Sequence, residues 1–86
     1  MQPVEGDTSS FLTSFANYTL DPNSRPSLAC AAVCNALKAS TNEVSSCNTF
    51  VLKDGLCYLG YLEPLWIVEN TGVGIGTDII YTDVFN

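Results

Sequence analysis

The chain has 86 residues, of which 47% are hydrophobic and only 14% charged, and a formal net charge of −6. Its only cations, Arg25, Lys38 and Lys53, leave no basic patch for phosphates or anionic lipid, and no run of about 18 apolar residues is present, so we expect neither nucleic-acid binding nor membrane insertion. A single domain of this size has a modest core, and its low charge fraction predicts a surface that is partly covered.

The first predicted elements follow a polar segment. Residues 1–9 contain a proline and a glycine and indicate a flexible N-terminal segment, so we place a single domain over residues 10–86. Residues 11–20 are rich in Phe, Leu, Thr and Tyr and predict a strand. Apolar side chains at helical spacing then predict a helix over residues 28–39, with Ser27 as its N-cap.

A hairpin and a closing strand complete the predicted fold. Residues 47–53 and 56–62 are strand-like and flank Asp54-Gly55, a dipeptide typical of tight hairpin turns. Residues 65–69 predict another short strand, and residues 78–85 predict the last one, after a loop with three glycines. Together these elements predict an α+β fold, in which one helix packs across an antiparallel sheet of about five strands.

Four cysteines predict two disulfides and an oxidising, extracellular setting: Cys30, Cys34, Cys47 and Cys57. A zinc site is less favoured, because the spacings lack a C-x2-C knuckle and the chain has no histidine. Cys30 and Cys34 lie one helical turn apart and should both point toward the sheet. Both bridges are therefore expected to join helix to sheet, in either a nested or a crossed pairing.

Side-chain alternation constrains the hairpin turn. A two-residue Asp54-Gly55 loop would place Cys47 and Cys57 on opposite faces of the hairpin. A three-residue loop, Lys53-Asp54-Gly55, instead sets Val51 opposite Cys57 and returns Cys47 to the same face. We therefore predict the three-residue turn.

Three motifs resemble the PAN/apple module of extracellular proteins over about residues 27–61: Ser27-x2-Cys30-x3-Cys34, Cys47-Asn48-Thr49-Phe50 and Gly55-Leu56-Cys57-Tyr58-Leu59. The resemblance implies a helix tied across an antiparallel sheet by nested bridges, Cys30 with Cys57 and Cys34 with Cys47. It also implies an adhesion or recognition module that binds protein or carbohydrate. The third bridge of the apple subgroup is absent from this chain.

Asn17-Tyr18-Thr19 matches the N-glycosylation pattern N-x-[ST], which predicts a secreted glycoprotein modified at Asn17. The alternative is an ordinary strand asparagine. An attached glycan would place Asn17 outside the core and keep that part of the surface from close packing.

No catalytic, metal or cofactor site is predicted. The chain has no histidine to act as a base, and its cysteines are expected to be oxidised. Glu69, Asp78 and Asp83 lack the EF-hand pattern and are expected to be solvated rather than to bind calcium. The segment Gly72-Val73-Gly74-Ile75-Gly76 lacks the strand and helix context of a dinucleotide loop. We therefore expect a protein that is not an enzyme.

The sheet face away from the helix is the expected interaction surface. In the predicted register, Thr49 and Val51 face the helix, and a single helix cannot cover the opposite face as well. Terminal segments or another subunit must then cover that face. The candidate interface consists of large apolar side chains: Phe50, Leu52, Leu56, Tyr58 and Trp66.

These features favour an extracellular, non-catalytic interaction or adhesion module. Its expected partners are copies of itself or sister domains in a matrix, coat or filament. The alternative is a carbohydrate-binding domain that uses an aromatic face, with Trp66 and Tyr58 as the first candidates.

Overall fold

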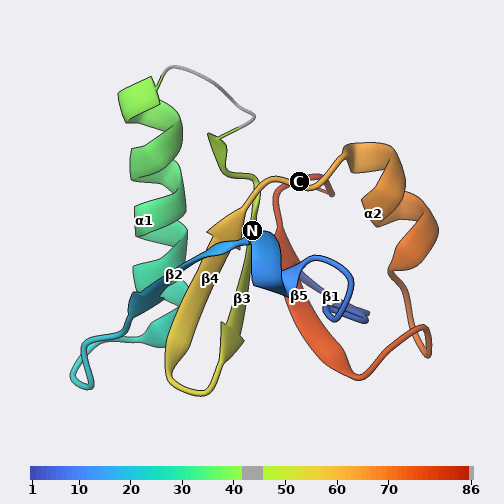
Figure 1. Cartoon of the computed structure of the whole chain (residues 1–86), viewed down its shortest axis with the longest axis horizontal. Helices are drawn as coiled ribbons and strands as arrows, with labels where there is room; N and C mark the ends of the chain where they lie inside the picture. The colour runs from blue at the N-terminus through green and yellow to red at the C-terminus, as the bar shows by residue number, and fades with distance from the viewer. Residues whose placement is uncertain (42–45, 86) are drawn as a thin grey trace.

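The computed structural model describes residues 1–41 and 46–85, which form an α+β fold. A five-stranded antiparallel sheet has the strand order β1-β5-β3-β4-β2. Figure 1 shows the long helix α1 and the short helix α2 on opposite sides of this sheet. None of the described helices is long and apolar enough to cross a membrane. The elements, in chain order, are β1 (Gln2–Gly6), the 3-10 helix η1 (Leu12–Ser14), β2 (Ala16–Thr19), α1 (Pro26–Thr41), β3 (Thr49–Lys53), β4 (Leu56–Gly60), α2 (Pro64–Asn70) and β5 (Asp78–Thr82).

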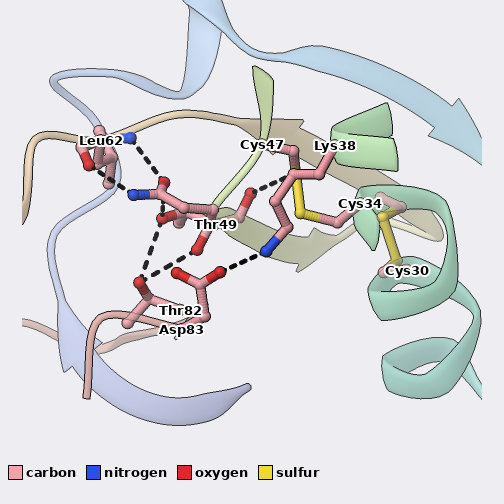
Figure 2. Close-up of a disulfide and its surroundings, with 10 residues drawn as sticks. Cys30, Cys34, Lys38, Cys47, Thr49, Leu62, Thr82 and Asp83 are labelled. Atoms are coloured by element: carbon pink, nitrogen blue, oxygen red, sulfur yellow. Dashed lines mark hydrogen bonds and ion pairs between the residues drawn. A yellow bond between two sulfur atoms is a disulfide. The ribbon is translucent and has the colours of Figure 1, made fainter. Parts of the chain in front are cut away.

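Two disulfides join α1 to the hairpin region: Cys30 to Cys57, with Cα atoms 5.9 Å apart, and Cys34 to Cys47, with Cα atoms 5.4 Å apart. Cys30 and Cys34 project from the same side of α1, and all four cysteines are buried. The nested pairing that the PAN/apple resemblance implies is therefore confirmed, as is the prediction that both bridges join helix to sheet. Figure 2 shows the two bridges near one another beside α1.

Helix α1 begins earlier than predicted. Its first residue is Pro26, whose fixed φ suits the first helical position, and the Ala29 N–H donates to the Arg25 carbonyl at 2.9 Å. Ser27 therefore lies inside the first turn and is not the N-cap. Alanines make up much of the helix and give it high helix propensity with little apolar bulk.

The hairpin turn also differs from the prediction. Lys53 pairs with Leu56, so Asp54 and Gly55 form a two-residue turn in which both residues have positive φ, 54° and 76°. Asp-Gly favours this turn because Gly carries no penalty in the left-handed region. The three-residue prediction is wrong because it assumed that Cys47 belongs to the strand. In the structure β3 begins two residues later, so strand alternation does not fix the direction of Cys47.

The sheet face beneath α1 is held by the cysteines together with apolar side chains. We call this cluster the disulfide face; it comprises Cys30, Cys34, Cys47, Phe50, Cys57 and Leu59. Phe50 is 1% exposed and stacks on Tyr81 of β5, with ring centroids 4.7 Å apart. Apolar residues of α1, including Val33 and Leu37, pack against its rim.

The opposite sheet face is covered by the chain itself. We call this cluster the α2 face; it comprises Phe11, Phe15, Val51, Leu62, Ile67 and Ile80. The Phe11 ring packs on Phe15, with centroids 4.9 Å apart, and meets the Trp66 ring of α2 nearly edge to face at 5.5 Å. The chain itself buries this face, partly through the N-terminal segment before β2, as expected of a terminal segment, and partly through α2, which is an internal helix.

The N-terminal segment is part of the sheet, so the prediction of a flexible segment over residues 1–9 is wrong. Strand β1 pairs antiparallel with β5, from Gln2 opposite Thr82 to Gly6 opposite Asp78. Its polar composition and its proline suggested a loop, but both are compatible with an edge strand. The pairing partner lies at the far end of the chain, where no local sequence signal indicates it.

Two other segments have a different secondary structure from the one predicted. The strand predicted over residues 11–20 is the 3-10 helix η1 followed by the shorter strand β2. The strand predicted over residues 65–69 is helix α2, which begins at Pro64. Ile67 and Val68 favour strands by propensity, but the helix turns Ile67 into the α2 face while Val68 stays 57% exposed. Burial on one side therefore outweighs the local β preference.

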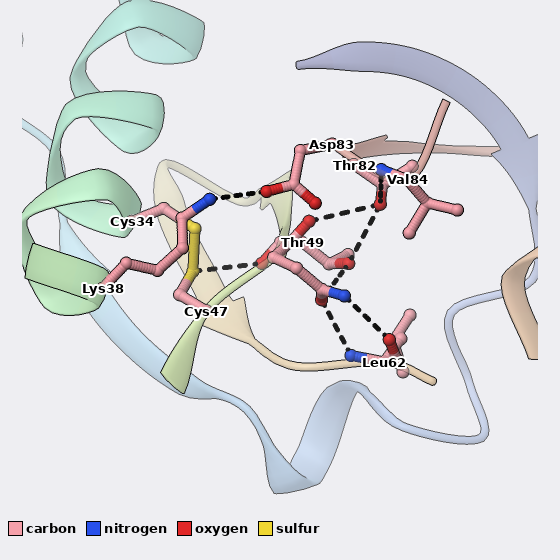
Figure 3. A network of polar contacts seen from close by, with 9 residues as sticks. Cys34, Lys38, Cys47, Thr49, Leu62, Thr82, Asp83 and Val84 are labelled. Carbon is pink, nitrogen blue, oxygen red and sulfur yellow. Dashed lines mark hydrogen bonds and ion pairs between the residues drawn. A yellow bond between two sulfur atoms is a disulfide. The ribbon is translucent and has the colours of Figure 1, made fainter. Parts of the chain in front are cut away.

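A buried polar network joins the two faces at one end of the sheet (Figure 3). Asn48 is 5% exposed, and its side chain donates from Nδ2 to the Leu62 carbonyl and accepts at Oδ1 from the Leu62 N–H, both at 2.9 Å. The Thr49 hydroxyl donates to the same Oδ1 at 2.9 Å, and the Thr82 hydroxyl donates to the Asn48 carbonyl at 3.2 Å. Asn48 thus fixes the chain where it leaves β4 toward α2.

The network continues to α1 through an ion pair. Lys38 donates to Asp83 Oδ2, and the two side chains are 24% and 28% exposed. The Asp83 N–H also donates to the Asn48 carbonyl at 3.2 Å. Figure 2 shows this pair beside the bridge between Cys34 and Cys47. The ion pair therefore ties α1 to the end of β5, next to the disulfide that links α1 to the segment before β3.

Candidate interaction surface

Helix α1 does not cover the whole of its side of the sheet. The helix packs mainly on β3 and β4, whereas β5 and β1 extend beyond it (Figure 1). Ile79 lies two residues from Tyr81 on β5, so both side chains point to the same side of the sheet as α1. A shallow hollow of about 380 Å³ lies at this end of the sheet; we call it the β1–β5 groove, and it is lined by Pro3, Val4, Glu5, Gly72, Val73 and Ile79.

The groove is apolar and open to solvent. Val73 is 98% exposed and Ile79 is 43% exposed, and the neighbouring Ile75 is 51% exposed. Glu5 is the one charged residue of its lining. Its carboxylate accepts a hydrogen bond from the Gly74 N–H at 3.1 Å, which joins the side chain to the loop between α2 and β5.

The loop between α2 and β5 builds the outer wall of the groove. The Gly72 N–H donates to the Glu5 carbonyl at 2.9 Å, which fixes the loop along the outer side of β1. Gly76 passes so close to β1 that an added Cβ would clash with the carbonyl group of Gly6. Only glycine fits at this crossing, and the close approach presents Val73 beside the sheet.

Thr8 and Asp78 fasten the neighbouring segment. Thr8 is 1% exposed and donates to Asp78 Oδ2 from its hydroxyl at 2.8 Å and from its backbone N–H at 3.2 Å. These hydrogen bonds, the hydroxyl first, hold the pKa of the Asp78 carboxyl below its ordinary value because they favour the ionised form. The first residue of β5 is thereby tied to the chain that leaves β1.

A second hollow lies beside α2. It measures about 370 Å³ and is lined by Ser10, Phe11, Tyr61, Leu62, Glu63 and Trp66. Aromatic rings, a carboxylate and a hydroxyl meet there. Tyr61 also borders a third hollow of about 270 Å³, on the side of Asp83 and Val84.

The residues of the predicted interface do not form one surface, so that prediction is corrected. Phe50 and Leu52 belong to the disulfide face, because the two-residue turn sets Leu52 opposite Cys57. Tyr58 and Trp66 pack against the α2 face, and Leu56 is half-buried. Val51 and Thr49, expected to face α1, point the other way. The error follows from the turn, because a one-residue shift exchanges the faces.

Other predicted site residues are dispersed. Asn17 lies exposed on β2, opposite Tyr58 of β4, and its glycosylation stays a prediction. The Asp78 carboxylate accepts a hydrogen bond from Thr8, and the Asp83 carboxylate pairs with Lys38. Glu69 is exposed on α2. Within residues 1–41 and 46–85 the structure has no group of three or more His, Cys, Asp or Glu side chains that could hold a metal ion.

The sequence pattern does not predict the groove residues as a site. It places Pro3 in a predicted flexible segment and Val73 in a predicted loop with three glycines. A usable signal was present, because Val73 and Ile75 are large apolar residues between glycines, where a loop gives them little cover.

No protein-family model, curated protein or solved structure matches this chain.

Proposed function

We propose that the protein is a secreted, non-catalytic interaction module that packs through the β1–β5 groove with copies of itself or with sister extracellular domains. The observation that carries the proposal is the open, apolar β1–β5 groove, where Val73 is 98% exposed beside Ile79. Large exposed apolar side chains gathered over one end of a sheet are typical of protein interfaces.

Two further features support this function. The two disulfides are typical of oxidising, extracellular compartments, and they hold the sheet in one shape before a partner binds. The groove has one carboxylate in its lining, that of Glu5, which accepts a hydrogen bond from the Gly74 N–H within the chain. A standard interface buries about 800 Å² per partner, so such an interface would include surface around the groove as well.

The test is the oligomeric state of the oxidised protein in sedimentation velocity over a concentration series. We expect reversible association, and we expect Val73→Asp to weaken it at least about tenfold, because the new carboxylate would be buried without a partner. Val73 is almost fully exposed, so the substitution leaves the core intact. Leu28→Asp, at a 62% exposed position on α1, adds the same charge elsewhere and should associate like the wild type. A wild-type protein that stays monomeric at every concentration contradicts the proposal.

A second candidate function is carbohydrate binding at the hollow beside α2. Trp66 and Tyr61 line this hollow with aromatic rings, and Glu63 adds hydrogen-bond acceptors, which is the combination that a sugar ring needs for stacking and orientation. Tyr58, the other residue expected for this role, does not line the hollow. In a glycan-array screen, Glu63→Gln should weaken any binding while Glu69→Gln, at the other end of α2, should not. A silent array would remove this candidate.

A further inference from the structure

The two edges of the sheet differ in their capacity to pair. The β1 edge is closed: the Glu5 carbonyl points away from β5 and is already bonded to the Gly72 N–H. Backbone groups of alternate residues point to the same side of a strand, so Pro3 also faces outward, and proline has no N–H to offer. A further strand would find neither a free donor at Pro3 nor a free acceptor at Glu5.

Among the residues that the structure describes, the β2 edge has none of these protections. β2 is the last strand on its side of the sheet, and its four residues are all exposed. The Leu20 N–H donates to the Gly55 carbonyl on the β4 side, so by alternation Tyr18 also points toward β4, while Asn17 and Thr19 direct their backbone groups outward. The strand, Ala16–Thr19, contains no proline and no charged residue, which are the usual means of protecting an edge.

The N-glycosylation pattern lies on this open edge. Asn17 and Thr19, the two residues that define it, are the two whose backbone groups face outward. Both side chains are exposed, so the folded protein has room for a glycan at Asn17. A bulky solvated group at this position would obstruct any strand that approached β2.

We propose that Asn17 carries an N-linked glycan that blocks the β2 edge, and that without it β2 pairs with β2 of a second copy. In the modification, Asn17 Nδ2 forms a bond to the anomeric carbon of a lipid-diphosphate-linked oligosaccharide. The bond between that carbon and the diphosphate oxygen breaks, the amide nitrogen loses one proton, and the lipid diphosphate leaves.

The occupant of the bare edge is a second copy because the edge is self-complementary. Two β2 strands related by a two-fold axis perpendicular to the sheet are antiparallel, so the outward N–H and C=O groups of each can meet those of the other. No charged residue of β2 opposes its equivalent across the junction. The closed β1 edge then stops further growth, so the expected product is a dimer and not a fibre.

The experiment uses the full chain, secreted from a eukaryotic host, with Val73→Asp present in every variant so that the β1–β5 groove cannot contribute. Intact mass spectrometry is expected to show a glycan on Asn17 and sedimentation a monomer. Asn17→Gln and Thr19→Ala, which both abolish the pattern, should lack the glycan and dimerise. Thr19→Ser keeps the pattern and should remain a glycosylated monomer.

A fifth variant separates edge pairing from other effects of losing the glycan. Asn17→Pro also lacks the glycan, but it removes the outward N–H while the bonds of β2 to β4 remain, so it should stay monomeric. Melting curves check that each variant is folded. The proposal is overturned by an unmodified Asn17 in the secreted protein, by monomeric Asn17→Gln and Thr19→Ala, or by an Asn17→Pro dimer as tight as that of Asn17→Gln. These results leave the groove proposal unaffected, since the groove is tested by Val73→Asp alone.

Discussion

The two faces of the sheet are held by different forces. The disulfide face receives an alanine-rich helix of little bulk, and two covalent bridges fix that helix in place. The α2 face has no covalent link and relies on large buried side chains such as Phe11, Phe15 and Ile67. The difference shows how a chain of 86 residues stabilises two layers with few large side chains: covalent bonds replace apolar bulk on one face.

The largest expected effect on stability comes from removing the disulfides of the disulfide face. Replacing Cys30 and Cys57 by alanine opens the longer loop, with a sequence separation of 27, and should lower the free energy of unfolding by about 3.5 kcal/mol in the chain-entropy model. The matched pair Cys34 and Cys47, with a separation of 13, should cost about 3 kcal/mol. Urea unfolding measures both. A loss under about 1 kcal/mol for either pair would show that the helix is held by packing instead.

The α2 face should respond to loss of bulk. Ile67→Ala removes a fully buried side chain and should cost about 3 kcal/mol, through lost burial and the cavity left behind. Val68→Ala is the control, since Val68 is its neighbour on α2 but 57% exposed and should change stability by about 0.5 kcal/mol or less. Equal effects of the two substitutions in urea unfolding would mean that α2 does not cover the sheet as described.

The polar network between the faces should give a smaller effect. Asn48→Ala leaves the buried N–H and carbonyl of Leu62 without their partner and should cost about 2 kcal/mol. Asn35→Ala, at an exposed position of α1, is the matched control and should be nearly neutral. Thermal melting compares the two variants. A neutral Asn48→Ala would show that water replaces these hydrogen bonds.

The smallest effect is a pH dependence at the start of β5. The pKa of Asp78 is lowered by the hydrogen bonds from Thr8, so the group contributes stability above the unfolded-state pKa of about 3.9 and loses it as the pH falls through the folded-state value. Asp78→Asn should therefore flatten the loss of stability on acidification. The measurement is urea unfolding across the acidic range for both proteins, and parallel curves would rule out this role of Asp78.

Short-range signals predicted the helix, the hairpin and the disulfides of the disulfide face, but not which strand residues belong to it. The alanine-rich helix with cysteines one turn apart and the Asp54-Gly55 hairpin are encoded by neighbouring residues, and the PAN/apple resemblance implied the nested pairing. The face assignment failed because alternation was counted from Cys47, which lies before the strand. One misplaced strand boundary was enough to exchange Phe50 and Val51 between faces.

Contacts between residues distant in sequence determine β1, α2 and the β1–β5 groove. β1 is a strand because β5, at the far end of the chain, pairs with it, and α2 is a helix because one of its sides covers the sheet. The β1–β5 groove joins Pro3, Val73 and Ile79, which are distant in sequence. Local propensity cannot bring such residues together, so the candidate surface was not predictable without the fold.

Hydrogen exchange of the native protein, with and without a mild reductant, tests most directly whether the two faces are held by different forces. Reduction should increase exchange most in α1 (Pro26–Thr41), because its covalent links are lost, while α2 (Pro64–Asn70) keeps more of its protection through packing. Two results would contradict this account: α1 stays protected after reduction, or the two helices lose protection together. Either would show that the disulfide face is not held by covalent bonds and the α2 face by packing.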